Sequence, residues 1–185
     1  SFQLLRELKG RYSFILVSTG ATYDDEIRKA AYVLEGDNFA FLHCVTLYPT
    51  PLSEFNLARM QFLKEFCPTV GLSDHSLYAR DGVFASIAAI YLGADIIERH
   101  FTIFPQDQTK DGPVSIDSEG LKQIHNFSKL STVDQKAYLD DILPDWQNIL
   151  IGNSLRPLSE TEILNRNYYR GRFASNFLDD VGNTR

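Results

Sequence analysis

Cysteine and long apolar runs are both scarce in this sequence, and each scarcity excludes a class of protein. Only Cys44 and Cys67 among the 185 residues are cysteines, which is too few for a disulfide scaffold and suits a reducing compartment such as the cytoplasm. No uncharged run, residues 82–94 included, reaches the roughly 20 apolar residues that a membrane span needs. The N-terminus mixes Arg, Glu and Lys with Leu and holds no secretory signal. A membrane, secreted or fibrous protein is therefore not expected.

Basic residues are also in deficit. The 18 lysines and arginines are outnumbered by 24 aspartates and glutamates, which leaves a net charge of −6. A broad nucleic-acid-binding surface is therefore not expected, and an anionic ligand would need a local cradle of donors. Hydrophobic residues make up 44% of the chain and charged residues 23%, an ordinary globular composition that argues against disorder.

Four short apolar runs alternate along the chain with helical patterns. Continuous apolar runs of this length are typical of strands buried on both faces of a parallel sheet. The predicted strands are Ser13–Ser18, Phe39–Cys44, Val70–Ser73 and Asp95–Arg99. The predicted helices are Phe2–Lys9, Asp24–Leu34, Glu54–Phe66, Asp81–Leu92 and Ser118–Leu130.

The predicted strands end at residues 18, 44, 73 and 99, each about one βα unit after the last. Such a period is typical of two α/β folds, the doubly wound sheet and the (β/α)₈ TIM barrel. No Gly-rich dinucleotide fingerprint or phosphate P-loop opens any predicted helix. The barrel is therefore preferred, although four units make only half of one.

The periodicity weakens after residue 130. Residues 133–143 predict one more helix, and residues 159–165 predict a short capped helix. From residue 166 onward no clear period remains, which predicts an extended backbone. We interpret residues 131–185 as a helical and extended C-terminal arm.

Polar side chains gather where the predicted strands end, which is the edge that binds ligands in both folds. His75 and His100 each follow a strand, and the two strands are consecutive. Both imidazoles should therefore lie at neighbouring places on the rim, where they could hold a divalent metal ion with oxygen ligands from substrate or water. The alternative is that each histidine only hydrogen-bonds a loop. His43, within a strand, is interpreted as structural, and His125 as solvent-facing.

Three other residues at this edge are candidates for the site. Glu98 and Arg99 are adjacent in a strand, so one of them points inward. An inward carboxylate beside a metal ion can orient water or act as an acid or base, and the alternative is an ion pair with a cation of the rim. Ser18 opens a Ser-Thr-Gly sequence that could face an anion or form an ordinary turn. Tyr48 lies in a loop stiffened by two prolines, which could hold it over a pocket or simply pack it.

Five motifs, spaced about one βα unit apart, resemble those of one family. Together they resemble the sialic acid synthase family, which comprises N-acetylneuraminate synthase and its relatives, including spore coat polysaccharide synthases. The resemblance covers about residues 3–130. The motifs are VSTGA (17–21), LHC (42–44) with YPTP (48–51), GLSDH (71–75), ERHFT (98–102) and DGP (111–113).

This resemblance implies a (β/α)₈ barrel whose last four βα units, the second half of the barrel, are residues 1–130. It implies condensation of phosphoenolpyruvate with an N-acylated hexosamine in its open aldehyde form. The products would be a nine-carbon 2-keto sugar acid and phosphate.

The resemblance also implies roles for individual residues. His75 and His100 would hold a divalent ion, Mn²⁺ or Mg²⁺. They would be catalytic together with Glu98, which would lie by the water of that ion. Phosphoenolpyruvate would be contacted by Ser18 and Ser73. The sugar site would be lined by Tyr48.

The sequence departs from the family pattern at two substrate positions. Thr46 stands where the family usually has an asparagine, and it remains a candidate substrate contact although it lacks an amide. Val114 stands where an acid commonly contacts the sugar, so that contact is missing unless Asp107 or Asp111 replaces it. One alternative is therefore a related phosphoenolpyruvate aldol-type synthase that acts on another aldose. A second alternative is a non-catalytic carbohydrate-binding half-barrel, whose histidines would carry no metal.

The resemblance further implies segments without a counterpart in these 185 residues. They are the first four strands, which supply lysines and a glutamate to the phosphoenolpyruvate pocket, and the C-terminal antifreeze-like domain of many members. Four strands alone would leave two unpaired edges and an apolar inner face against water. We therefore expect the chain to be inactive by itself. Either the other half precedes Ser1 in the native polypeptide, which the helix predicted at Phe2–Lys9 favours, or two copies pair into a pseudo-complete barrel. We expect the complete enzyme to be a cytoplasmic homodimer without nucleic-acid or membrane partners.

Overall fold

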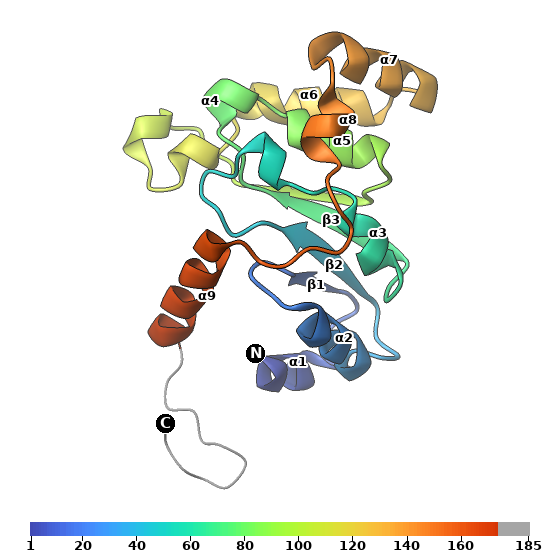
Figure 1. The fold of residues 1–185 in the computed structure, drawn as a ribbon, viewed down its shortest axis with the longest axis vertical. Helices are drawn as coiled ribbons and strands as arrows, with labels where there is room; N and C mark the ends of the chain where they lie inside the picture. Colours follow the sequence, from blue (N-terminus) through green and yellow to red (C-terminus); the bar gives the residue numbers. More distant parts are fainter. Residues whose placement is uncertain (174–185) are drawn as a thin grey trace, which may run out of the picture.

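A parallel sheet of four strands forms the centre of the molecule (Figure 1). The computed structural model describes residues 1–173 of the chain. The strands lie side by side in chain order, and every pairing is parallel. The predicted α/β half-barrel is therefore confirmed. The strands are β1 (Ile15–Ser18), β2 (Phe39–Cys44), β3 (Thr69–Asp74) and β4 (Ile96–Arg99).

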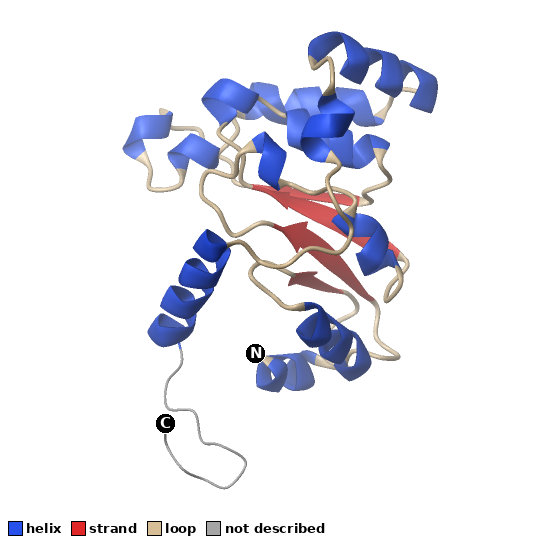
Figure 2. Cartoon of the chain, viewed as in Figure 1, coloured by secondary structure: helices blue, strands red, loops and turns tan. Residues whose placement is uncertain are grey.

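Helices connect the strands and continue beyond the last one (Figure 2). They are α1 (Phe2–Leu8), α2 (Asp24–Val33), α3 (Arg59–Lys64), α4 (Tyr78–Asp81), α5 (Phe84–Tyr91), α6 (Ser118–Ser128), α7 (Thr132–Ile142), α8 (Trp146–Leu150) and α9 (Glu160–Phe173), with short 3₁₀ turns η1 (Leu52–Glu54), η2 (Gln106–Gln108) and η3 (Gly112–Val114). α3 packs on β2 and β3, and α5 packs on β3 and β4. None of the helices described is both long and apolar enough to cross a membrane.

Alternation along the strands sorts their side chains onto two faces. Phe41 of β2 and Leu72 of β3 belong to the core that the helices cover. The opposite face is the inner face of the half-barrel, and it curls tightly around Gly71. A Cβ atom at Gly71 would lie 2.3 Å from the Ile96 carbonyl oxygen and 2.6 Å from Leu42 Cδ2. The curl thus needs a glycine at this point.

The inner face is exposed at its edge rather than throughout. β1 and β4 each pair on one side only, as expected of four strands alone. Leu16 of the edge strand β1 is 52% exposed, whereas Leu42 of the central strand β2 is buried. The expected exposure of the apolar inner face therefore holds at the β1 edge and does not hold at Leu42 in the centre.

Two helices between the strands begin later than predicted. The helix expected from Glu54 begins at Arg59, because Asn56 adopts a left-handed φ of 50° that a helix does not tolerate. The helix expected from Asp81 is divided by Gly82, which has a φ of 54°, so that α5 begins beyond it. Both differences follow from residues with positive φ.

The largest difference concerns the C-terminal arm. α9 begins with a capping box, in which the Ser159 hydroxyl accepts from the Glu162 N–H and the Glu162 carboxylate accepts from the Ser159 N–H. The helix then continues through residues 166–173, so the extended backbone expected there is wrong. Arg166 makes tertiary contacts that stabilise this continuation. Residues 174–185 of the expected arm lie outside the described residues.

Candidate functional site

A row of polar side chains crosses the inner face where the strands end. Its members are Ser18 of β1, Cys44 of β2, Ser73 of β3 and Glu98 of β4. The Ser73 hydroxyl donates to the Glu98 carboxylate, and the register of β3 and β4 pairs these two residues directly. Burial raises the pKa of the Cys44 thiol, although the Ser18 and Ser73 side chains beside it act in the opposite direction. Cys44 is therefore a protonated thiol rather than a nucleophile.

The two histidines predicted to bind metal lie side by side at the rim, just beyond β3 and β4. The ring centroids of His75 and His100 are 5.2 Å apart, and the ring planes are inclined by 68°. The Tyr48 ring packs against His75, with 4.2 Å between the centroids. The structure thus brings these three predicted site residues together, and metal binding by the histidines stays a prediction.

Burial determines the protonation state of His75. It lowers the pKa of His75 to about 4, and the neighbouring His100 acts in the same direction. The imidazole is therefore neutral at pH 7 and keeps a nitrogen lone pair, which is the form that ligates metal ions. No three His, Cys, Asp or Glu side chains form a metal cluster within residues 1–168. A metal ion at this pair would therefore need oxygen ligands from substrate or water.

Adjacent residues of β4 divide between the two faces. Glu98 lies on the inner face with Ser73, whereas Arg99 points behind the sheet, as the alternation of a strand requires. The sequence required one of these two residues to point inward, and it is the carboxylate.

A buried ion pair lies directly behind the two histidines, and the sequence analysis missed it. Asp74 precedes His75, Arg99 precedes His100, and the two charged side chains are almost fully buried. Arg99 Nη1 donates to Asp74 Oδ2 at 2.7 Å, and the Ser86 hydroxyl of α5 donates to the same oxygen at 2.6 Å. The pair links β3 to β4 where the histidines leave the sheet. Its signal in the sequence was a charged residue one position before each histidine.

An acid lies near the site histidines, but it does not stand at position 114. Val114, in η3, is buried, so it packs into the fold rather than facing the rim. Asp111, which precedes η3, has its Oδ2 atom 3.8 Å from His100 Nδ1. Asp111 thus supplies an acid beside the site histidines.

The other predicted substrate residues lie at the ends of β1 and β2. Ser18 is exposed on the inner face. Thr46 is only 7% exposed, and its carbonyl accepts a hydrogen bond from the Asn165 amide of α9 at 2.7 Å. The hydrogen bond of Thr46 thus runs to α9 rather than to the histidines. Asn165 could not be predicted as a neighbour of this loop, because the C-terminal segment shows little apolar periodicity.

The remaining histidines behave as predicted. His43 Nε2 lies 2.5 Å from the Phe55 carbonyl oxygen, and burial lowers the pKa of His43 to about 4. This ring is neutral and its nitrogen is occupied, so it is structural. His125 is exposed on α6.

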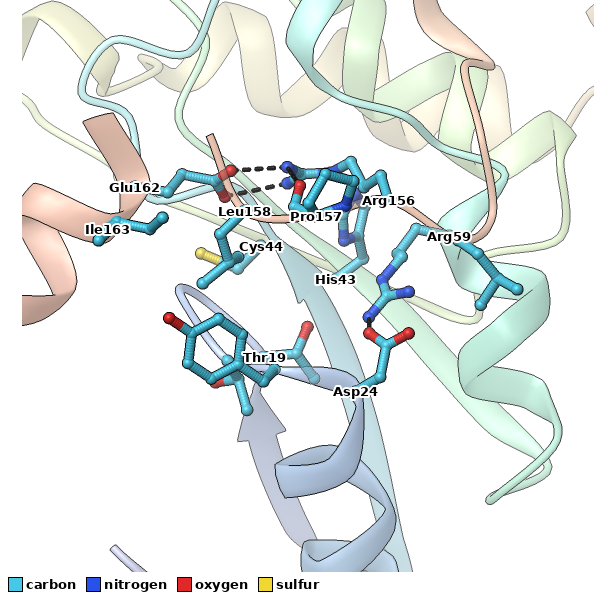
Figure 3. Close-up of a pocket in the computed structure, with 13 residues that line it drawn as sticks. Thr19, Asp24, His43, Cys44, Arg59, Arg156, Pro157, Leu158, Glu162 and Ile163 are labelled. Carbon is cyan, nitrogen blue, oxygen red and sulfur yellow. Dashed lines mark hydrogen bonds and ion pairs between the residues drawn. The ribbon is translucent and has the colours of Figure 1, made fainter. Parts of the chain in front are cut away.

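A cavity of about 490 Å³ lies at the ends of β1 and β2, beside the polar row (Figure 3). Its walls include two ion pairs, Arg59 with Asp24 and Arg156 with Glu162. Each of these arginines is balanced by an acid, which argues against an anion site. The described lining residues include neither site histidine, but they include Cys44, whose Sγ lies 3.9 Å from His75 Nδ1. The cavity therefore adjoins the histidine pair without containing it.

Residues 1–136 of the chain match the NeuB family. The chain is 40% identical over 116 residues to the N,N'-diacetyllegionaminic acid synthase of Campylobacter jejuni, and the match covers 60% of this chain and 34% of that protein. It is 30% identical over 164 residues to the pseudaminic acid synthase of the same species, covering 86% of this chain and 42% of that protein.

A solved structure agrees with these sequence matches. The spore coat polysaccharide biosynthesis protein SpsE of Bacillus subtilis superposes with a TM-score of 0.71 at 26% identity, covering 90% of this chain and 46% of that chain. The chain therefore spans less than half the length of these relatives.

Proposed function

This chain belongs to the NeuB family, and we propose on that premise that it supplies half the barrel of a phosphoenolpyruvate-using sugar acid synthase. The second substrate is an N-acylated hexosamine in its aldehyde form. A carbon–carbon bond forms between the methylene carbon of phosphoenolpyruvate and the aldehyde carbon, whose oxygen takes up a proton. Water then adds to C2 and phosphate leaves, which gives a nine-carbon 2-keto sugar acid. The relatives named as pseudaminic and diacetyllegionaminic acid synthases support this product class.

One observation carries the proposal. His75, His100, Glu98 and Ser73 converge where β3 and β4 end, with the two imidazoles 5.2 Å apart and the serine bonded to the carboxylate. The carboxyl ends of the strands are the edge at which (β/α)₈ enzymes carry out chemistry.

The residues of the rim divide the work between the two substrates. The Ser73 hydroxyl keeps the Glu98 carboxylate oriented on the inner face, and we assign Glu98 to orient the attacking water or to accept its proton. Ser18 and Ser73 are assigned to phosphoenolpyruvate. Tyr48, which packs on His75, is assigned to the sugar, and Thr46 on the same loop stays a candidate contact.

The donor set of the rim fits a divalent cation. His75 is neutral at pH 7 because burial lowers its pKa to about 4, although the nearby Glu98 and Asp74 carboxylates act to raise that pKa. We assign Mn²⁺, or Mg²⁺, to His75 and His100. Such an ion, when bound, would polarise the aldehyde oxygen of the sugar.

Phosphate release tests the proposed reaction. The complete protein, given phosphoenolpyruvate, Mn²⁺ and an N-acylated hexosamine, should release phosphate and form a 2-keto acid. Glu98→Gln should lower kcat by about a hundredfold or more, the loss expected of an acid or base. Glu119→Gln, at an exposed acid of α6, is the matched control and should leave kcat unchanged. Sugar binding without phosphate release would instead support the carbohydrate-binding half-barrel.

Val114 bears on the identity of the sugar. Its buried apolar side chain offers no acceptor to a sugar hydroxyl. A site built to bond a hydroxyl discriminates strongly for it, and this discrimination is lost where the acceptor is missing. We therefore infer a sugar that is less hydroxylated or differently acylated than N-acetylmannosamine. A panel of N-acylated hexosamines ranked by kcat/KM tests this, and N-acetylmannosamine as the best substrate would refute it.

The setting of the enzyme follows from the thiols and the family. Cys44 and Cys67 are both free and buried, which fits a reducing compartment. We place the complete enzyme in the cytoplasm, as a homodimer.

A further inference from the structure

α9 lies beside the ends of β1 and β2, far along the chain from the loops that it contacts (Figure 1). Arg166 of α9 is 9% exposed. Its Nη1 donates to the Ala21 carbonyl, and its Nη2 donates to Glu26 Oε1 at 2.6 Å. Its guanidinium lies over the Tyr23 ring, 4.4 Å from the centroid. One side chain thus joins α9 to the β1–α2 loop (residues 19–23) and to the first turn of α2.

The loop that Arg166 contacts has a strained backbone. Ala21 has a φ of 47°, in the left-handed region that costs an L-residue about 1–2 kcal/mol. Because the carbonyl of this residue accepts from the guanidinium, a charge-assisted hydrogen bond stabilises the strained conformation. Ser18 leads directly into this loop, so the placement of its hydroxyl depends on the loop conformation.

Asn165, the neighbouring residue on α9, contacts the second substrate loop. Its Nδ2 donates to the Thr46 carbonyl at 2.7 Å, two residues before Tyr48. The two loops also touch each other, since a Cβ atom at Gly20 would lie 2.8 Å from Thr46 Oγ1. Adjacent residues of one helix therefore fix both loops.

α9 is anchored by contacts that do not involve these loops, and one of them, between Arg156 and Glu162, is drawn in Figure 3. Arg156 makes two hydrogen bonds to the Glu162 carboxylate, at 2.6 and 2.9 Å. Two residues before Arg156, the Ser154 carbonyl accepts a hydrogen bond from Arg59 Nη1 of α3 at 2.9 Å. The helix thus has a fixed position from which it can act on the loops.

We propose that Asn165 and Arg166 are positioning residues for the two substrates. Arg166 sets the loop that follows Ser18, and Asn165 sets the loop that carries Tyr48. The inference rests on the proposed function, which assigns these two loops to phosphoenolpyruvate and to the sugar. Neither residue of α9 touches a substrate in this scheme. Their effect is on substrate binding, because the loop that Arg166 contacts adjoins Ser18 and the loop that Asn165 contacts carries Tyr48.

Amide hydrogen exchange tests the proposal on the complete protein without requiring activity. Arg166→Met should raise the exchange rate of amides 19–23 by about tenfold or more and leave the amides of β3 and β4 unchanged. Arg166→Lys, which keeps the charge and one donor, should restore part of the protection. Asn167→Ala, at an exposed position of the same helix, is the control and should match the wild type. An increase in the exchange rate across all four strands, or no increase for the loop amides 19–23, would overturn the proposal.

Steady-state kinetics provides the second readout. Arg166→Met should raise the KM for phosphoenolpyruvate about tenfold, and Asn165→Ala should raise the KM for the sugar about fivefold, each with little change in kcat. A fall in kcat at unchanged KM would contradict a positioning role. If the wild type itself releases no phosphate, the proposed function is refuted, and the exchange rates of the variants alone then decide whether α9 holds the loops.

Discussion

His43 and His75 are both buried, and burial lowers the pKa of each to about 4. They differ in what occupies the ring nitrogens. His43 Nε2 lies 2.5 Å from a backbone carbonyl, whereas the contact of His75 Nδ1 is a thiol sulfur at 3.9 Å. A ring nitrogen that already has a strong hydrogen-bond partner cannot bind a metal ion, whereas a ring nitrogen with only a weak partner can. The surroundings of each ring, more than its protonation, therefore separate the structural histidine from the candidate ligand.

His43 should make stability depend on pH in the acid range. Its pKa falls from 6.5 to about 4 on folding, so between these values the unfolded chain binds the extra proton. The stability that neutral His43 supports is therefore complete above about pH 6.5 and is lost as the pH falls towards 4, by at most about 3 kcal/mol.

The variant His43→Gln tests this dependence, because its amide can still donate to Phe55 but cannot titrate. The free energy of unfolding, measured in urea from pH 4 to 7.5, should fall less steeply with acid in the variant than in the wild type. His75 contributes with the same sign, so a smaller slope should remain. An identical slope in both proteins would show that His43 is not the titrating group.

At the scale of elements, the sheet curls around one glycine. Gly71 lies in β3 between its two neighbours, and a Cβ atom there would meet the backbone of Ile96 and the side chain of Leu42. The same ladder pairs Gly71 with Ile96 and, two residues further on, Ser73 with Glu98. The geometry of the site thus depends on a residue that takes no part in it.

Gly71→Ala should therefore destabilise the fold by about 3 kcal/mol or more, since backbone must move to accept the methyl group. Gly10→Ala is the comparison, because that glycine has φ +70° but open space around it, so it should lose only about 1–2 kcal/mol. Unfolding midpoints in urea measure both. Equal losses in the two variants would contradict the close approach at Gly71.

The elements show which parts of the structure could be predicted from the sequence. The strands could be predicted, because continuous apolar runs of this length are typical of buried strands in an α/β chain. The ends of the predicted strands then placed His75, His100 and Glu98 on one rim. The late start of α3 could not, because nothing in the sequence required a positive φ at Asn56. The length of α9 was missed for another reason: its stability comes from tertiary contacts of Arg166 with residues 140 or more positions away, which local periodicity does not record.

At the scale of the whole molecule, the sheet has two open edges, β1 and β4. Phe14 and Leu16, at the β1 edge, are 45% and 52% exposed, and Ile103 and Phe104, beyond β4, are 81% and 59% exposed. A closed barrel has no edges and fills its interior with side chains. These surfaces are therefore where four further βα units would pack.

The 185-residue chain, prepared by itself, should accordingly associate in solution or bind a hydrophobic dye, and it should release no phosphate. Exposed apolar surface of this kind destabilises a domain by roughly 25 cal/mol per Å². Mass in solution and a phosphate assay with phosphoenolpyruvate, Mn²⁺ and an N-acylated hexosamine make the test. A stable and active monomer would refute this view of the chain.

The central claim is that the rim of this half-barrel carries a divalent metal site made by His75 and His100. Titration of the metal-free complete protein with Mn²⁺, followed by the loss of the free-ion electron paramagnetic resonance signal, tests it most directly. The wild type should bind one ion per chain, and His75→Ala and His100→Ala should each weaken binding by more than about tenfold. His125→Ala, at the exposed histidine of α6, should bind like the wild type. Unchanged Mn²⁺ affinity in both rim variants would contradict the claim.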